Sequence, residues 1–421
     1  MSIRLICRSA LTHWMAAAAS LLTAYAPASS LAQASAPASA PAATPSSATL
    51  KIGVIGPFTG PSSDFGLPML QGVQLAAEQI NAGGGYMGRQ LTLVIKDDQG
   101  NPDVGLKGSQ ELVTEGVTAT IGFCNTGVAA KSLEVFQNAK MPLLIPCATG
   151  TPLTAKYPGP SSYIFRTSAR DAIQAPFVVN HILSKGWNKV AIFADTTGYG
   201  EAGLKDVEAA LAARGLKAVH IARFGLGVKD LTEELTAARA AGANVVFSYT
   251  VGTENAVIAL GRKELKWKVP QVGAWPLSFP FFINGAKEAA EGALMAQTFI
   301  AEPSNERRAS FLSAYKRMFN QPMAVPMAAA QGYDTTYLLT YALFTVRNGQ
   351  DTLAGPAIKS GLENIKRIYY GVVGTYDKPF SLDDKDALTA NMLVMGKVSN
   401  GVVTFANPAD AKRNLFVQRK Q

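Results

Sequence analysis

The sequence predicts an α/β protein with two doubly wound, open parallel sheets, and three observations support this. The chain has 421 residues, which is too long for one small core and suits two lobes of ordinary size. Hydrophobic residues make up 48% of it and charged residues only 16%, which is a globular profile. From Leu50 onward, short apolar runs alternate with helical stripes, an order typical of parallel sheets covered by helices.

The first unit runs from Leu50 to Asn81 and is predicted to form a strand, a tight turn and a helix. Residues 50–55 are a short apolar run suited to a strand covered on both faces, and residues 56–61 break it with glycine and proline. Pro68 is expected in the first helical turn, where its missing N–H is no loss. The apolar stripe of this helix consists of Leu70, Val73, Ala77 and Ile80. A helix N-terminus just past a parallel strand is suited to holding an anion.

The other elements follow in two series separated by the polar segment 166–171. The first series continues with strands at 91–96, 118–123 and 142–146 and helices at 103–115 and 129–139. The second series has strands at 189–194, 217–223, 244–249 and 271–274 and helices at 172–185, 201–214, 230–241 and 254–264. Further helices are expected at 309–319 and 327–348, before a strand-rich tail at 369–405. The two series predict two facing units whose strand-end loops hold a ligand.

The N-terminus has the features of an export signal. Arg4 and Arg8 supply positive charge, residues 14–26 are apolar, and Ala32–Gln33–Ala34 offers small residues at cleavage spacing. A membrane anchor, the alternative, needs about 20 apolar residues, and this stretch is shorter. We therefore expect residues 1–33 to be a signal peptide and the Ala/Pro/Ser-rich residues 34–48 to be an unstructured linker. The mature protein is expected to be soluble outside the cytoplasm.

Charge and cysteine content narrow the class of protein further. The net charge of +9 falls to +7 without Arg4 and Arg8, and the basic residues are scattered rather than gathered in a stripe. Nucleic-acid binding is therefore not expected. Cys124 and Cys147 remain in the mature chain, each after an apolar run, so they are expected to end neighbouring strands. The sequence is compatible with a disulfide between them and with a pair of buried thiols.

The sequence lacks the motifs of an enzyme. It contains no HExxH, CxxC, GxSxG or Walker A pattern, and its first turn, residues 56–60, is not GxGxxG. Neither a catalytic site, nor a metal site, nor a cofactor is therefore predicted. Asp97 ends a strand, where loop hydrogen bonding is favoured over ribose binding. Tyr333, Tyr337 and Tyr341 recur four apart, a spacing that favours helix packing over a ligand box.

Hydroxyl-bearing residues collect where two strands end. Thr126–Gly127 follows the third strand and residues 149–151 follow the fourth, in both cases before a helix. Such loops can donate several hydrogen bonds to a carboxylate without an arginine. Ordinary N-capping explains either loop alone. Both together, beside the apolar Phe65, favour a ligand site.

Seven short segments carry motifs of a known family: residues 51–61, 71–72, 80–84, 97–102, 146–149, 199–201 and 331–334. As a set they resemble the leucine/isoleucine/valine-binding protein family, the periplasmic receptors of ATP-driven (ABC) importers. The resemblance implies a type I periplasmic binding fold with two lobes, three hinge crossovers and closure over a small ligand. It places residues 49–167 and 298–375 in an N-terminal lobe, and residues 168–297 and 376–421 in a C-terminal lobe. It also implies a periplasmic monomer that delivers its ligand to a membrane permease.

The resemblance also implies roles for individual residues. Phe65 would wall the pocket, Thr126 would meet the ligand carboxylate, and Thr149 would bind it through hydroxyl and N–H. The carbonyl of Cys147 would face an ammonium group, and Tyr199 would come from the second lobe. The full predicted ligand site is Phe65, Thr126, Gly127, Cys147, Ala148, Thr149, Tyr199 and Trp275.

One departure from the family pattern bears on the ligand. Amino-acid binders of the family have an acidic residue after the strand that corresponds to residues 271–274, whereas Trp275 stands here. Tryptophan offers a flat apolar wall or a cation–π face, unless it only packs at the hinge. The expected ligand is therefore a small carboxylate, aromatic or branched aliphatic, with an amino acid still open. A sensor subunit that docks to a receptor or kinase is the alternative function. The cysteine pair of some relatives is not matched, since Gly100 and Asn125 stand there.

Overall fold

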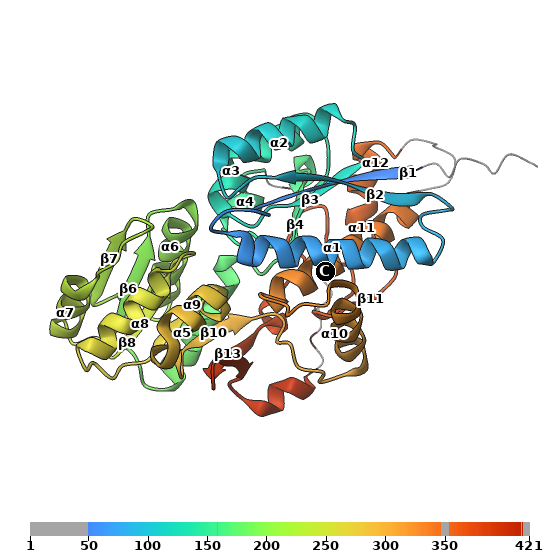
Figure 1. Cartoon of the computed structure of the whole chain (residues 1–421). Helices are drawn as coiled ribbons and strands as arrows, with labels where there is room; N and C mark the ends of the chain where they lie inside the picture. Colours follow the sequence, from blue (N-terminus) through green and yellow to red (C-terminus); the bar gives the residue numbers. More distant parts are fainter. Residues whose placement is uncertain (1–48, 158, 347–352, 414, 416–421) are drawn as a thin grey trace, which may run out of the picture. The chain divides into compact units, whose positions relative to one another are not determined.

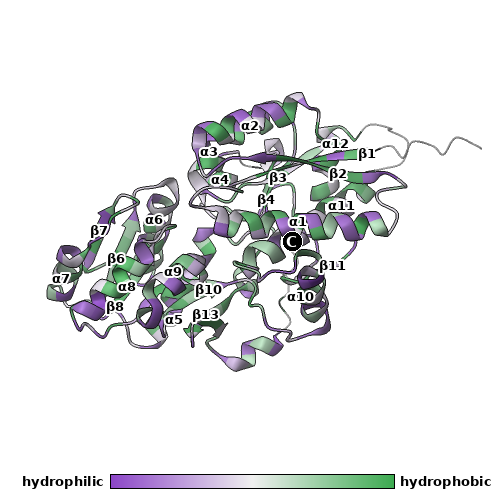
Figure 2. Ribbon diagram, viewed as in Figure 1, coloured by the Kyte–Doolittle hydropathy of each residue, from purple (hydrophilic) through white to green (hydrophobic). Residues whose placement is uncertain are grey.

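The computed structural model describes residues 49–157, 159–346, 353–413 and 415 (Figure 1). The predicted signal peptide and linker lie outside these residues. In the described part of the chain, no helix combines the length and apolar character needed to span a bilayer. Figure 2 shows hydrophobic colouring concentrated in the strands, with mixed colouring on the helices.

The first sheet has five strands, each of which follows an apolar run. They are β1 (Thr49–Gly56), β2 (Gln90–Asp97), β3 (Ala119–Gly122), β4 (Leu143–Ile145) and β5 (Ile164–Arg166). All are parallel, in the order β2-β1-β3-β4-β5. Neighbouring residues of β1 face different hydrophobic clusters, since Val54 packs in one and Ile55 in another. Apolar side chains thus cover both faces, as predicted for a doubly wound sheet.

Helices cover both faces of this sheet. They are α1 (Ser63–Ala82), α2 (Pro102–Thr114), α3 (Thr126–Asn138), α4 (Pro152–Ala155), α10 (Glu306–Phe319), α11 (Pro326–Thr345) and α12 (Gly355–Glu363). α1 packs against α11, and α2 packs against α3. The prediction for Pro68 was wrong, because α1 begins at Ser63 and Pro68 lies inside it. Tyr333 and Tyr337 both donate to Oε1 of Gln79 on α1, at 2.6 and 3.1 Å, which is the packing role expected of them.

The second sheet has seven strands and is mixed rather than wholly parallel. Its strands are β6 (Val190–Asp195), β7 (His220–Phe224), β8 (Val245–Tyr249), β9 (Gln271–Gly273), β10 (Leu294–Gln297), β13 (Val394–Ser399) and β14 (Val402–Phe405). The order is β14-β13-β10-β9-β8-β6-β7. β13 and β14 pair antiparallel because Asn400 and Gly401, both at positive φ, join them as a hairpin. The helices of this half are α5 (Asp171–Ser184), α6 (Gly198–Ala212), α7 (Thr232–Ala240), α8 (Glu254–Glu264) and α9 (Pro280–Ala286).

The remaining elements are short. They are the two-stranded pair β11 (Tyr369–Tyr370) and β12 (Thr375–Tyr376) and the 3₁₀ turns η1 (Gly159–Ser161), η2 (Trp275–Ser278), η3 (Lys287–Ala290), η4 (Ala390–Met392) and η5 (Pro408–Lys412). Three segments connect the two larger sheets: residues 167–170 between β5 and α5, 298–305 between β10 and α10, and 377–393 between β12 and β13. The chain therefore crosses between the sheets three times.

Candidate ligand-binding site

One pocket of about 400 Å³ lies where strands of both sheets end. Its lining residues follow β1, β2, β3 and β4 of the five-stranded sheet and β6, β7, β8 and β9 of the seven-stranded sheet. Ligands of open α/β sheets bind beyond the carboxyl ends of the strands, so this is the expected place for a site. Five of the predicted ligand residues line it, namely Thr126, Gly127, Thr149, Tyr199 and Trp275.

The N-terminus of α3 is open toward this pocket. α3 begins at Thr126, three residues earlier than predicted, and the side chain of its N-cap residue Asn125 makes no capping hydrogen bond. Asn125 Nδ2 instead donates to Ser62 Oγ at 3.1 Å. Thr126 Oγ1 accepts from the N–H of Gly150 at 3.2 Å, which leaves the hydroxyl proton free to point elsewhere. The free N–H groups and this hydroxyl can bind an anion.

The N-terminus of α6 also reaches the pocket, but it is capped. Thr197 Oγ1 accepts from the N–H groups of Tyr199 and Gly200, at 3.2 and 3.4 Å. The ring of Tyr199 lies 4.9 Å from that of Tyr249, and no described residue hydrogen-bonds to its hydroxyl oxygen. Because its N-terminus is occupied by the cap, α6 presents a phenol to the pocket, and α3 is the side suited to a carboxylate.

An aromatic cluster closes one wall. Trp275 lines the pocket and is 3% exposed, and its ring meets that of Phe279 edge-on at 4.8 Å. Phe65 stacks on Phe279 at 5.0 Å and lies 6.3 Å from Trp275. Phe65 is not one of the lining residues, because Phe279 and Trp275 bury it in this cluster. Ligand contact by Phe65 stays a prediction, whereas its packing against Trp275 supports the wall that Trp275 forms.

Cys147 and Ala148 lie behind the loop that carries Thr149. Both are buried and neither lines the pocket. Within the described residues, no hydrogen bond ends on the carbonyl of Cys147, and its contact with a ligand ammonium group stays a prediction. Cys124 and Cys147 are both buried free thiols at the ends of neighbouring strands. Burial raises the pKa of the Cys124 thiol well above its ordinary value, so this thiol is protonated at neutral pH.

The sequence reasoning missed a buried acid beside the pocket. Asp171, the first residue of α5, is 0% exposed, and burial raises the pKa of its carboxyl to about 7. The nearby hydroxyls of Tyr249 and Thr149 oppose this rise. Only its place at the end of the polar segment 166–171 could have drawn attention to it. Asp98, also 0% exposed, has a pKa raised by burial to about 7, and it accepts from the N–H of the lining residue Gly100 at 2.8 Å.

Two glycines bring α3 and α6 into close approach. A Cβ added at Gly198 would lie 3.3 Å from the Cα and 3.4 Å from the N of Gly127. We expect Gly198→Val to weaken ligand binding by about tenfold or more, because the branched side chain would push the two helix ends apart. Titration calorimetry measures this. Gly225→Ala, in the same half with nothing within 4 Å of the added Cβ, is the control. Equal affinity of both variants would contradict the prediction.

Comparison with known proteins places this geometry among related chains. The model of the family described as "Periplasmic binding protein" matches residues 49–401. The Leu/Ile/Val-binding protein homolog 3 of Brucella melitensis is 35% identical over 202 residues, which cover 48% of this chain and 54% of that protein. The chain thus matches only about half the length of this relative. The Leu/Ile/Val-binding protein of Escherichia coli K12 is 24% identical over 347 residues, covering 80% and 93%.

Solved structures share the fold. The periplasmic binding protein type 1 of Bordetella pertussis Tohama I aligns with a TM-score of 0.76 at 23% identity, covering 85% of this chain and 99% of that one. The branched-chain amino acid transporter substrate-binding protein of Streptococcus pneumoniae, in complex with isoleucine, aligns with a TM-score of 0.71 at 23% identity. The alignment covers 84% of this chain and 97% of that one. A solute-binding protein of R. palustris, in complex with benzoate, aligns with a TM-score of 0.71 at 17% identity. The alignment covers 85% of this chain and 95% of that one.

Proposed function

This chain belongs to the periplasmic binding protein family, in its Leu/Ile/Val-binding branch, and from that premise we propose that it captures a small carboxylate-bearing ligand for an ABC importer. Its relatives are solute-binding proteins rather than enzymes, and it is a substrate-binding protein of the branched-chain amino acid transporter type. The ligand class, the permease partner, the monomeric state and export to the periplasm are parts of the proposal.

The observation that carries the proposal is the uncapped N-terminus of α3 in the pocket. Thr126 and Gly127 stand there, and Thr149 faces them from the loop after β4. Oriented N–H groups and hydroxyls at a helix N-terminus bind a carboxylate without a counter-charged side chain. A pocket of about 400 Å³ is the size of a small-metabolite site.

The aromatic wall points to a ligand with an apolar body. Trp275 stands where amino-acid binders of the family carry an acid, and it offers a flat surface to a ring or a branched chain. The two relatives solved with isoleucine and with benzoate bind a branched and an aromatic carboxylate. We propose the same chemical class here, either as a plain acid or as an amino acid.

Strand pairing and helix packing support the proposed lobes. β13 and β14 join the sheet of β6 to β10, and α11 packs on α1 of the other half. We accordingly propose a C-terminal lobe of residues 168–297 and 376–421, and an N-terminal lobe of residues 49–167 and 298–375. Closure of such lobes would bury the ligand and present a joint surface to the permease.

Calorimetric titration of the purified protein tests the function. The panel is L-leucine, L-isoleucine, L-valine, benzoate and 4-methyl-2-oxopentanoate, with L-lysine and glucose as controls. We expect saturable binding of at least one carboxylate with an apolar body and none of glucose. Binding of glucose alone, or of no carboxylate, would overturn the proposal.

Loss of the Thr149 hydroxyl tests the anion site directly. We expect Thr149→Ala to weaken binding of the panel ligand by about 1–3 kcal/mol, the value of a hydrogen bond to a charged group. Thr336→Ala is the matched control, since it also removes a buried hydroxyl, one that bonds its own helix at the carbonyl of Gly332. Unchanged affinity in Thr149→Ala would remove Thr149 from the site.

A further inference from the structure

The loop after β4 is held through its carbonyl oxygens. The carbonyl of Ile145, the last residue of β4, accepts from the N–H of Thr167 at 2.9 Å, and in the loop the carbonyl of Ala148 accepts from Ser168 Oγ at 2.7 Å. The carbonyl of Thr149 accepts from the N–H of Asp171 at 2.9 Å. These donors belong to the crossover between β5 and α5 and to Asp171, the first residue of α5. The crossover therefore fixes which way the peptide groups of the loop point.

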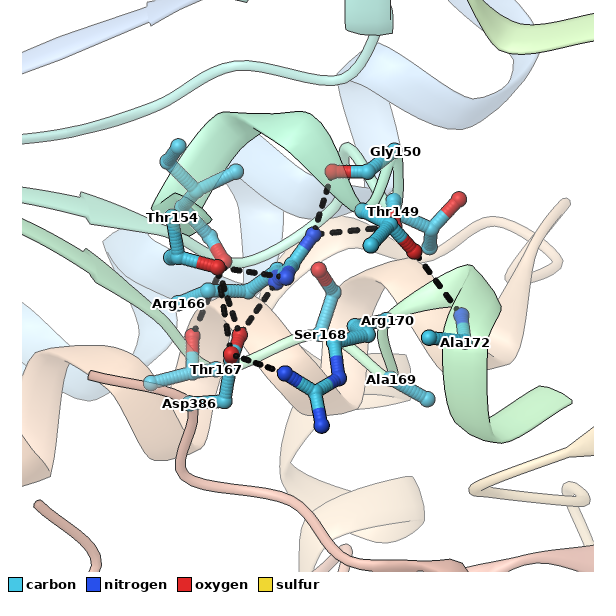
Figure 3. A network of polar contacts seen from close by, with 12 residues as sticks. Thr149, Gly150, Thr154, Arg166, Thr167, Ser168, Ala169, Arg170, Ala172 and Asp386 are labelled. Carbon is cyan, nitrogen blue, oxygen red and sulfur yellow. Dashed lines mark hydrogen bonds and ion pairs between the residues drawn. The ribbon is translucent and has the colours of Figure 1, made fainter. Parts of the chain in front are cut away.

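Arg166, the last residue of β5, makes the most contacts to this loop (Figure 3). Its side chain is 0% exposed. Nη1 donates to the carbonyl oxygens of Thr149 and Gly150, at 2.9 and 2.7 Å. Nη2 donates to Thr154 Oγ1, on α4 directly after the loop, at 2.7 Å. A planar guanidinium holds these acceptors in one fixed arrangement, which a single ammonium could not reproduce.

The same guanidinium is tied to a second crossover through Asp386. Arg166 Nε donates to Asp386 Oδ1 at 2.6 Å, and Arg170 Nη1 contacts Asp386 Oδ2 at 3.3 Å. The backbone of Arg166 also pairs with this second crossover. The N–H of Arg166 donates to the carbonyl of Lys385, and the N–H of Ala387 donates to the carbonyl of Arg166, both at 2.8 Å. Asp386 lies in the segment 377–393 that leads to β13. Two of the three crossovers thus meet at Arg166.

We propose that Arg166 and Asp386 are positioning residues of the ligand site, which set the geometry of residues 147–151 from the hinge. The inference deepens the proposed function and rests on it. The carbonyl oxygens of Ala148, Thr149 and Gly150 are held, which fixes the orientation of the peptide groups on both sides of Thr149, the loop residue that lines the pocket. Because one guanidinium spans the loop and both crossovers, a change in the distance between the crossovers must alter the loop. Affinity and hinge conformation are therefore coupled through this pair.

A purely structural role of the pair would lower stability without changing the loop. Removing one partner of a buried ion pair leaves the other charge unpaired. The informative variants therefore either keep the positive charge at position 166 or replace both charged side chains by neutral ones that can hydrogen-bond. Arg166→Lys keeps the positive charge but loses the planar guanidinium with its several N–H donors. The double variant Arg166→Gln/Asp386→Asn removes both charges. Lys385→Met is the matched control, because Lys385 is also buried in the same crossover but pairs with Glu363 rather than with the loop.

Hydrogen–deuterium exchange of the ligand-free protein tests the positioning. We expect peptides that cover residues 147–156 to exchange about tenfold faster in both Arg166 variants than in wild type, with residues 254–264 of α8 unchanged. Lys385→Met is expected to keep wild-type exchange in the loop while its melting temperature falls. Wild-type exchange of the loop in Arg166→Lys would overturn the proposal whether or not any ligand binds.

Titration with L-leucine and with benzoate, at a temperature where every variant is folded, completes the test. We expect the dissociation constant of the ligand that binds wild type to rise about tenfold in both Arg166 variants and to stay within about twofold in Lys385→Met. Equal weakening in all three variants would mean a general stability effect and overturn the positioning role. If wild type binds neither probe but binds another carboxylate of the panel, that ligand takes their place. If it binds none of the panel, the proposed ligand class fails, and the exchange result alone decides the role of Arg166.

Discussion

Asp334→Ala is expected to lower the free energy of unfolding by about 3–5 kcal/mol, because it leaves four buried donors without an acceptor. Asp334 is 0% exposed on α11. Its carboxylate accepts from the N–H groups of Val372 and Val373 at 2.9 Å and from the hydroxyls of Tyr369 and Tyr376 at 2.8 and 3.2 Å. Burial raises the pKa of this carboxyl to about 6, so it is largely ionised at pH 7.5, where urea denaturation measures the loss.

Glu208→Ala is the control for this prediction. Glu208 is an exposed residue of α6, and its removal should change stability by no more than about 0.5 kcal/mol. A loss below about 1 kcal/mol in Asp334→Ala would show that water or a shifted backbone can satisfy the four donors.

The helix that Asp334 stabilises also braces the ligand loop. On α11, Gln331 Nε2 donates to the carbonyl of Pro146 at 2.6 Å, and the hydroxyls of Thr335 and Thr167 lie 2.5 Å apart. These contacts join α11 to the end of β4 and to the first crossover. Damage at Asp334 should therefore reach the site through α11.

The sequence could predict the sheets and the polar loops because both follow local rules. Apolar runs bounded by glycine and proline became β1, β3 and β4, and the hydroxyl residues after them line the pocket. β5 was missed because it has only three residues and ends in Arg166, a residue that pattern reading assigns to a polar link. β10 and α12 were not predicted either. The antiparallel β13–β14 hairpin depends on pairing with β10, which is far away in sequence.

The sequence could not predict which side chains of the site line the pocket and which are buried beside it. Phe65 stacks on Phe279, 214 positions later in the chain, and is not among the lining residues, so its contact with a ligand stays a prediction. Arg166 and Asp171 are the first and last residues of the polar segment 166–171, which the sequence pattern indicated only as the separation between the two series. Their burial follows from the crossovers meeting beside the loop, a tertiary arrangement that no local spacing encodes.

The pH dependence of ligand affinity is expected to depend on Asp171. Its carboxyl lies beside Thr149 and Tyr199, both of which line the pocket, and it faces Tyr249, Asp206 and Arg166 as well. Burial raises its pKa from the ordinary 3.8 to about 7. The folded protein therefore binds this proton more tightly than the unfolded chain does. The stability this confers is complete below about pH 3.8 and is lost as the pH rises through about 7.

The same titration acts on a bound carboxylate. At pH 6 the carboxyl of Asp171 is mostly neutral and does not repel an anion, whereas at pH 8 it is mostly charged. We expect the affinity for benzoate to fall about three- to tenfold from pH 6 to pH 8, within the tenfold per unit that one proton allows. For L-leucine, whose ammonium group is attracted by the charged carboxylate, the affinity should fall less or rise.

Calorimetry at pH 6, 7 and 8 measures both slopes, and Asp171→Asn should flatten them. Asp98→Asn is the companion variant, because Asp98 titrates in the same range and bonds the lining residue Gly100. If Asp98 alone produced the pH dependence, Asp171→Asn would keep the wild-type slope, and the electrostatic role of Asp171 would be wrong. A difference in slope between benzoate and L-leucine that disappears in Asp171→Asn would instead show that this carboxyl senses the ligand's ammonium group. The pocket would then distinguish acids from amino acids through a residue at the start of α5 rather than through the position of Trp275.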